Sequence, residues 1–165
     1  MINLLMGAAM LIAPIAFTPT GKRTNSADDA INAALDRQAD GWNQGNGAVF
    51  AQDFTPDARF INVRGDLVVG REAIIKAHNF ILNGPYKGSH LRVEVDSITY
   101  PASTVAIVDV LLTVTNFKTL PPGLVPTEPD AMRTRMKFVF VEQGGEWKIA
   151  AGQNTIISPV KMDLK

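Results

Sequence analysis

The sequence predicts a single α+β domain in which a curved antiparallel sheet wraps around three helices. Helical periodicity is confined to the first half of the domain, and strand-like alternation dominates from His90 onward. A curved sheet is the natural way to bury three apolar helix faces at once. A half-closed cone of this kind tends to leave a cavity between the sheet and the helices.

The first helix is predicted from Ser26 to the glycine-rich stretch NQGNG, because Ile31, Leu35 and Trp42 recur at helical spacing. A short second helix, AVFAQDF, is expected to turn at Pro56. The third helix, REAIIKAHNFILN, carries its apolar residues on one face. The strands are predicted at residues 58–63, 67–69, 91–100, 104–117, 133–142 and 146–157. Pro101 is expected to end the third of these strands, and a proline-rich loop to cover residues 119–130.

Composition excludes several classes of function. The 165 residues include 16 Lys and Arg against 16 Asp and Glu, and this balance argues against nucleic acid as a partner. Cysteine is absent, so disulfides, a thiolate nucleophile and a cysteine metal site are excluded. Two histidines with scattered carboxylates have no metal-ligand spacing, and no phosphate loop or nucleophile elbow occurs. We therefore expect neither a metal nor a cofactor.

Residues 1–24 form an apolar leader that is set apart from the domain predicted for residues 25–157, and residues 158–165 form a tail. The leader has no charge before Lys22, and Pro14 interrupts it. It fits a degenerate export signal or weak anchor, a non-native start, or a short apolar helix packed on the domain. The protein would accordingly be exported or cytoplasmic.

Two ionisable side chains interrupt apolar runs and are the candidate bases. His78 falls at the centre of the third helix's apolar face, where it is either a neutral core histidine bonded to a backbone carbonyl or a ligand contact. Asp109 interrupts VAIVDVLL, and the alternating cations of RTRMK would suit it as partners on the outer face of the sheet. Its alternative is a carboxylate at the cavity.

Other side chains are expected at the cavity or in plain core. Trp42 and Phe60 are candidate cavity walls. Asn62 shares a strand face with Phe60, so it could form a polar pair with His78. One member of the Gln153–Asn154 pair should face inward, and Gln153 is the candidate.

Four short motifs in this order make the chain similar to a known family. They are W-N-x-G from Trp42, F-x-x-D-F-x-x-D-A-x-F from Phe50, G-R-E-A-I from Gly70 and G-x-W-x-I-A-A-x-Q-N-T from Gly145. Together they resemble the SnoaL-like group of the NTF2-like superfamily, and within it the SgcJ/EcaC-type, DUF4440-like proteins. The resemblance implies a cystatin-like α+β cone with a mostly apolar pocket, in a homodimer that pairs through the outer sheet face.

The resemblance also identifies where ketosteroid isomerase, a member of that superfamily, keeps its reacting groups. Its base falls at Asn62, its helix tyrosine at Gln38 and its late-strand acid near Met136. An amide is not basic near neutral pH, Gln38 is a weaker donor than a phenol, and Met136 can do neither job. Isomerase chemistry of that kind is therefore not expected.

Two functions follow as hypotheses. The preferred one is a dimeric protein that binds a small apolar or cyclic molecule without a catalytic set, through Gln38, Trp42, Phe60, Asn62, His78, Met136 and Gln153. The alternative is a cyclase, isomerase or dehydratase that acts on a polyketide-like or other cyclic apolar substrate, with His78 or Asp109 as base. A structural dimer whose pocket is filled by side chains is the third possibility.

Overall fold

The structure, a computed structural model, describes residues 25–121 and 123–157. The leader predicted for residues 1–24 and the tail predicted for residues 158–165 lie outside the described residues. None of the described helices combines the length and the apolar character that crossing a bilayer requires.

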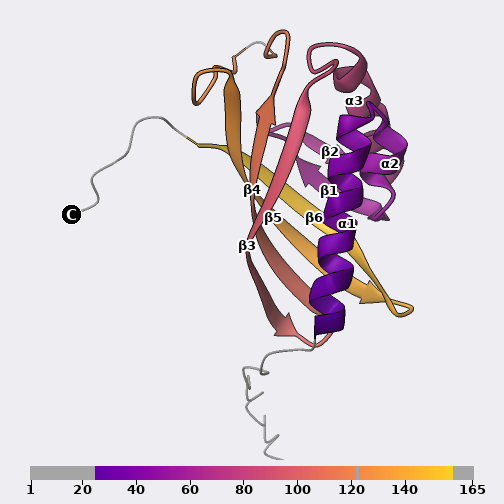
Figure 1. Ribbon diagram of the computed structural model, residues 1–165. Coiled ribbons are helices and arrows are strands. Elements are labelled where there is room, and N and C mark those ends of the chain that lie inside the picture. Colours follow the sequence, from indigo (N-terminus) through magenta and orange to yellow (C-terminus); the bar gives the residue numbers. More distant parts are fainter. Residues whose placement is uncertain (1–24, 122, 158–165) are drawn as a thin grey trace, which may run out of the picture.

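Three helices gather on one side of a twisted, curved sheet (Figure 1). The elements are α1 (Asn25–Asn43), α2 (Gly47–Ala51), β1 (Phe54–Ile61), β2 (Leu67–Val69), α3 (Arg71–Asn83), β3 (His90–Ala102), β4 (Val105–Thr115), β5 (Ala131–Gln143) and β6 (Glu146–Ile156). The predicted fold class, an α+β cone, is confirmed.

The sheet has the order β2-β1-β6-β5-β4-β3 and is not closed into a barrel. Its last four strands pair antiparallel, whereas β1 lies parallel to β6. This parallel pair brings the N-terminal hairpin β1–β2 to the edge of the C-terminal strands. Residues from both halves of the chain therefore meet over the same side of the sheet.

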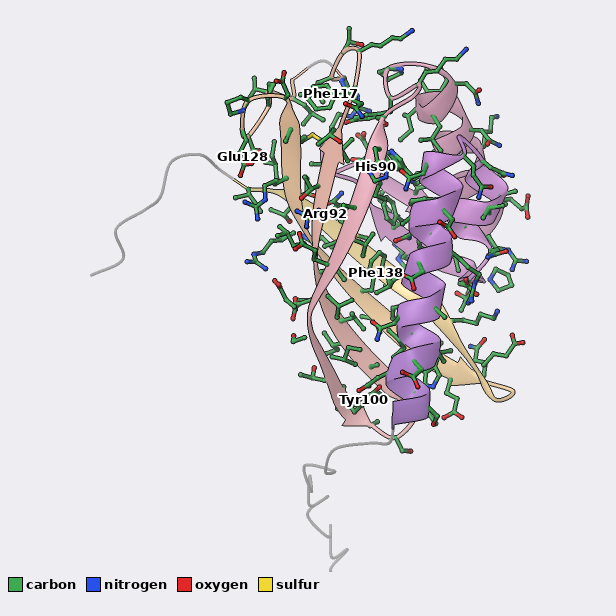
Figure 2. All side chains as sticks on the ribbon, viewed as in Figure 1. His90, Arg92, Tyr100, Phe117, Glu128 and Phe138 are labelled. Carbon is green, nitrogen blue, oxygen red and sulfur yellow. The ribbon has the colours of Figure 1, made fainter. Side chains whose placement is uncertain are left out.

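The first and third helices begin and end close to their predicted limits because their apolar spacing matches one buried face. In α1 the buried side chains include Ile31, Leu35, Gln38 and Trp42. In α3 the fully buried positions are Ile74, His78 and Leu82, each one turn after the last. Figure 2 shows the side chains on the ribbon, among them Phe138 of β5 and Tyr100 of β3.

Two predicted boundaries at prolines are wrong. The second helix ends at Ala51, and Pro56 lies inside β1, where the pairing with β6 shifts register between Phe54 and Arg59. Strand β3 continues through Pro101, which lies in another register shift on an edge strand. Proline is tolerated at such places because no ladder hydrogen bond needs its missing N–H.

Helices α1 and α2 approach so closely that only glycine fits at position 41. A Cβ atom there would lie 2.1 Å from the backbone nitrogen of Phe50. The contact is with backbone, which cannot move aside as a flexible side chain could. Gly41 therefore sets the position of Phe50, whose ring is buried in the interior.

We expect Gly41→Ala to lower the free energy of unfolding by about 3 kcal/mol, because the methyl group overpacks the helix contact. Urea unfolding followed by circular dichroism measures the loss. Gly45→Ala is the matched control: a Cβ there meets nothing within 4 Å, and only its positive φ of 68° is unfavourable, which costs about 1 kcal/mol. Equal losses in the two variants would contradict a steric role for Gly41.

Candidate functional site

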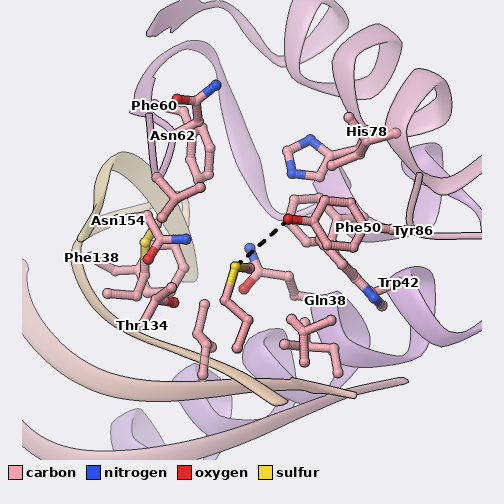
Figure 3. Close-up of a pocket in the computed structure, with 17 residues that line it drawn as sticks. Gln38, Trp42, Phe50, Phe60, Asn62, His78, Tyr86, Thr134, Phe138 and Asn154 are labelled. Atoms are coloured by element: carbon pink, nitrogen blue, oxygen red, sulfur yellow. Dashed lines mark hydrogen bonds between the residues drawn. The ribbon is translucent and has the colours of Figure 1, made fainter. Parts of the chain in front are cut away.

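A small cavity lies between the helices and the concave side of the sheet (Figure 3). Its volume is about 80 Å³. We call it the inner chamber, and its walls are Gln38, Trp42, Phe50, Phe60, Asn62, Val63, His78, Ile81, Tyr86, Leu91, Leu112, Val114, Met132, Thr134, Met136, Phe138 and Asn154. No Asp, Glu, Lys or Arg side chain is among these wall residues, so the chamber is apolar with a few neutral polar groups.

The imidazole of His78 lies within an aromatic cluster on one side of the chamber. It stacks on Phe50 with ring centroids 3.8 Å apart, and the edges of Phe60 and Trp42 approach at 5.5 and 6.4 Å. Trp42 in turn donates its indole N–H to Ser89 Oγ at 2.9 Å, which satisfies its polar edge. The cluster thus joins side chains of α1, α2, β1 and α3.

His78 is held as a neutral ring with one free nitrogen. Its Nδ1 lies 2.8 Å from the carbonyl oxygen of Ile74, one turn earlier in α3. Burial lowers the pKa of His78 to about 4, against the smaller opposing effect of that backbone hydrogen bond. A neutral ring that donates from Nδ1 leaves Nε2 as an acceptor. Figure 3 shows the ring directed into the chamber.

Asn62 lines the chamber, but its side-chain amide makes hydrogen bonds within the turn between β1 and β2. Its Oδ1 accepts hydrogen bonds from the backbone N–H groups of Arg64, at 2.9 Å, and Asp66, at 3.0 Å. Its Nδ2 donates to Asp66 Oδ2 at 3.0 Å. This is an Asx turn, so the side chain that could have paired with His78 instead shapes the hairpin.

Gln38 projects from α1 into the chamber, and its exposed fraction is 2%. Its Nε2 is buried and has no hydrogen-bond partner among the described residues. A buried donor without a partner costs about 1–3 kcal/mol. Gln38 is therefore an unusual residue to find in a wall that is otherwise built for packing.

The inward position on β6 belongs to Asn154, whereas Gln153 is exposed on the other face of the sheet. Asn154 pairs with the buried Met136 of β5, and Gln153 pairs with the exposed Lys137. Opposed residues of a pair point to the same face, which explains the assignment. Of the seven side chains predicted at the ligand site, Gln153 alone lies away from the inner chamber.

Asp109, the second candidate base, lies on the outer face of the sheet. Its carboxylate forms an ion pair with Lys137, and both side chains are exposed to solvent. The same face carries the ion pair between Arg135 and Asp96. The outer-face alternative for Asp109 therefore holds, and His78 is the one candidate base that lines the chamber.

A wider cavity, the vestibule, adjoins the inner chamber and shares Asn62, Val63, Ile81 and Tyr86 with it. Its volume is about 480 Å³. Its remaining walls come from the β1–β2 turn, from α3 and the loop that follows it, and from the proline-rich loop, namely Arg64, Ala77, Phe80, Pro85, Thr119, Leu120, Pro121 and Leu124. Apolar surface dominates here too, and Phe80 is 76% exposed at the rim.

Sequence reasoning missed several chamber residues. Thr134, Met136 and Phe138 alternate along β5 with outward cations, so Thr134 could have been found from this pattern. Tyr86 comes from a loop without periodicity, and no sequence signal predicted it. Its hydroxyl donates to the thioether sulfur of Met132, at 3.8 Å, and burial raises the pKa of Tyr86 to about 12.

The fold, the position of the chamber and the sequence together define the class of protein. The SnoaL-like domain family matches residues 31–157, and the chain belongs to this family. Among the described residues, no group of three or more potential ligands could hold a metal ion.

Solved structures agree with this assignment. A Nostoc punctiforme domain of unknown function with a cystatin-like fold is 28% identical, with a TM-score of 0.70 over 86% of this chain and 82% of that one. An uncharacterised Caulobacter vibrioides protein with the same fold is 28% identical, with a TM-score of 0.68 over 82% and 92%. A putative scytalone dehydratase from Novosphingobium aromaticivorans, 15% identical, has a TM-score of 0.66 over 80% and 85%, and shows the fold alone. No curated protein has a significantly matching sequence.

The buried neutral state of His78 makes stability depend on pH. The folded-state pKa of about 4 lies below the value of about 6.5 in an unfolded chain, so acid favours the unfolded state. The contribution of neutral His78 to the free energy of unfolding is fully present above about pH 6.5 and falls by about 3 kcal/mol as the pH drops to about 4. Urea unfolding across this range measures it. His78→Phe, which does not titrate, should flatten the slope, and an unchanged slope would contradict the assignment.

Proposed function

We propose that this SnoaL-like protein binds a small, largely apolar molecule in the chamber and vestibule and has no catalytic set. The observation that carries the proposal is an uncharged chamber with a few polar groups that shares four wall residues with a wider apolar vestibule. Concave apolar sites with a few convergent polar groups are typical of small-molecule pockets.

The size of the two cavities limits the ligand. The inner chamber, at about 80 Å³, is smaller than the cavity of about 150 Å³ that accepts benzene in another protein. A ring or chain of larger size must therefore extend into the vestibule of about 480 Å³. A ligand with a compact end and a longer apolar body fits this arrangement.

Catalysis as a cyclase, isomerase or dehydratase is supported less well. Asp109 is paired with Lys137 at the outer sheet face, away from the chamber, so that hypothesis depends on His78 alone. A pKa of about 4 makes His78 a weak base at neutral pH. Asn62 and Met136 cannot take a proton from a carbon acid.

Propylbenzene is a suitable first probe because it is apolar and elongated. We expect it to bind the wild type and to raise the melting temperature saturably, measured by differential scanning fluorimetry and isothermal titration calorimetry. Val114→Phe, which enlarges a buried wall residue of the chamber, should abolish this binding.

Val125→Phe is the matched control, because it makes the same change at an exposed loop position outside both cavities. It should leave propylbenzene binding unchanged. Absence of binding to the wild type, or equal binding to the Val114→Phe variant, would refute the proposed function.

We also propose that two copies pair through the outer face of the sheet. Ile61, Leu67, Val139 and Ala151 line a shallow apolar groove there, and Leu67 is half exposed. Charged pairs such as Asp109–Lys137 flank the groove on the same face. Apolar surface of this kind is typical of an interface, and the flanking charges would set the register of the partner.

If this face is the interface, a charge in the groove should separate the copies. We expect the purified wild type to sediment as a dimer in analytical ultracentrifugation and Val139→Arg to sediment as a monomer, because a desolvated unpaired cation is costly. Lys137→Arg keeps the charge beside the groove and should stay dimeric. A monomeric wild type would exclude the pairing.

A further inference from the structure

The inner chamber contains hydrogen-bonding groups that the protein itself leaves unused. Gln38 Nε2 is a buried donor without a partner among the described residues. Within the described part of the chain, the hydroxyl of Tyr86 reaches only a thioether sulfur, and sulfur is a weak acceptor. His78 offers Nε2 as an acceptor, since its Nδ1 is engaged by the carbonyl of Ile74. All three line the same small space (Figure 3).

Asn154 Oδ1 is a further buried wall atom without a partner among the described residues. The unpartnered groups are therefore two donors, Gln38 Nε2 and the Tyr86 hydroxyl, and two acceptors, His78 Nε2 and Asn154 Oδ1, without any formal charge. One hydroxyl group complements this set, because its oxygen accepts from Gln38 and Tyr86 while its O–H donates to His78, one of the two acceptors. A carboxylate or an ammonium group would find no opposite charge in the chamber wall, and burying an unpaired ion is strongly unfavourable.

The proposal rests on the proposed function of this site and specifies its ligand. We propose that the chamber recognises the hydroxyl end of a neutral amphipathic molecule, held by Gln38, Tyr86 and His78, while its apolar body occupies the vestibule. A ring that carries the hydroxyl would contact the aromatic wall of Trp42 and Phe50 at its hydroxyl end and extend into the vestibule, as in a phenol or a small cyclic alcohol.

Gln38 provides an argument from stability. An unpartnered buried amide is unfavourable in the free protein, so an apolar residue of similar size should pack better there. A buried polar group without a hydrogen-bond partner in the free protein is expected at a binding site, where the ligand supplies the missing partner. Gln38→Leu should therefore raise the melting temperature of the free protein while it weakens hydroxyl recognition.

Three probes with one body and different ends test the proposal by titration calorimetry: 4-propylphenol, propylbenzene and 4-propylbenzoate. The wild type should prefer the phenol to propylbenzene and should not bind the benzoate measurably. Gln38→Leu should shift the phenol-to-propylbenzene affinity ratio about tenfold toward propylbenzene, because the phenol oxygen loses a buried donor. Tyr86→Phe, which removes only a hydroxyl, and His78→Phe, which removes the acceptor, should shift it in the same direction.

Gln153→Leu is the control, since it makes the same change at an exposed position outside the chamber and should leave the ratio unchanged. A ratio that is the same in the wild type and in all three chamber variants would overturn hydroxyl recognition, as would measurable binding of the benzoate. In either case retained binding of propylbenzene would leave the proposed function intact. Failure of every probe to bind would defeat both.

Discussion

Burial of the His78 ring between Phe50, Phe60 and Trp42 is the contact on which the interior depends. It joins three helices and the first strand around one uncharged imidazole. The hydrogen bond to the Ile74 carbonyl satisfies one nitrogen within α3 itself, so the ring needs no partner from the sheet. Because the helices meet each other at this ring, they need not fill all the space against the sheet. The inner chamber is the space that remains.

The curved sheet separates two kinds of surface. Strand β5 turns Thr134, Met136 and Phe138 toward the chamber and its cations toward solvent. The outer cations Arg135 and Lys137 form ion pairs with carboxylates of β3 and β4, namely Asp96 and Asp109. Charge is thus compensated at the outer face, and the chamber keeps only neutral polar groups. This separation favours recognition by shape and by a few hydrogen bonds over recognition by charge.

Membership of the SnoaL-like family defines the fold. The function depends on the side chains of the site and not on the fold. In this chain the polar residues of the chamber wall are better suited to hydrogen bonding than to proton transfer. The amide of Asn62 is committed to its turn, and the phenol of Tyr86 stays protonated because burial raises its pKa to about 12. Gln38 Nε2 and Asn154 Oδ1 are buried wall atoms that have no hydrogen-bond partner among the described residues. The site therefore suits binding better than proton transfer.

The sequence by itself determined the helices α1 and α3, the hairpin β5–β6 and the inward position of His78. Each depends on a repeat of 3.6 or 2 residues that is visible along the chain. The family motifs added Gln38 as a candidate, which the spacing alone did not single out. The end of α2 before Pro56 and the end of β3 beyond Pro101 could not be predicted from the sequence, because a register shift between strands makes proline acceptable inside β1 and β3.

Other features were decided only by the tertiary structure, because they depend on contacts between segments far apart in the chain. The choice between Gln153 and Asn154 follows from the register of β6 against β5, which the alternation within β6 leaves open. The same pairing across strands sends Asp109 outward to Lys137. The volume of the chamber, and the arrival of Tyr86 at its wall from an irregular loop, follow from how closely the helices approach the sheet. No local periodicity encodes that distance, because it is set by the packing of all the side chains together.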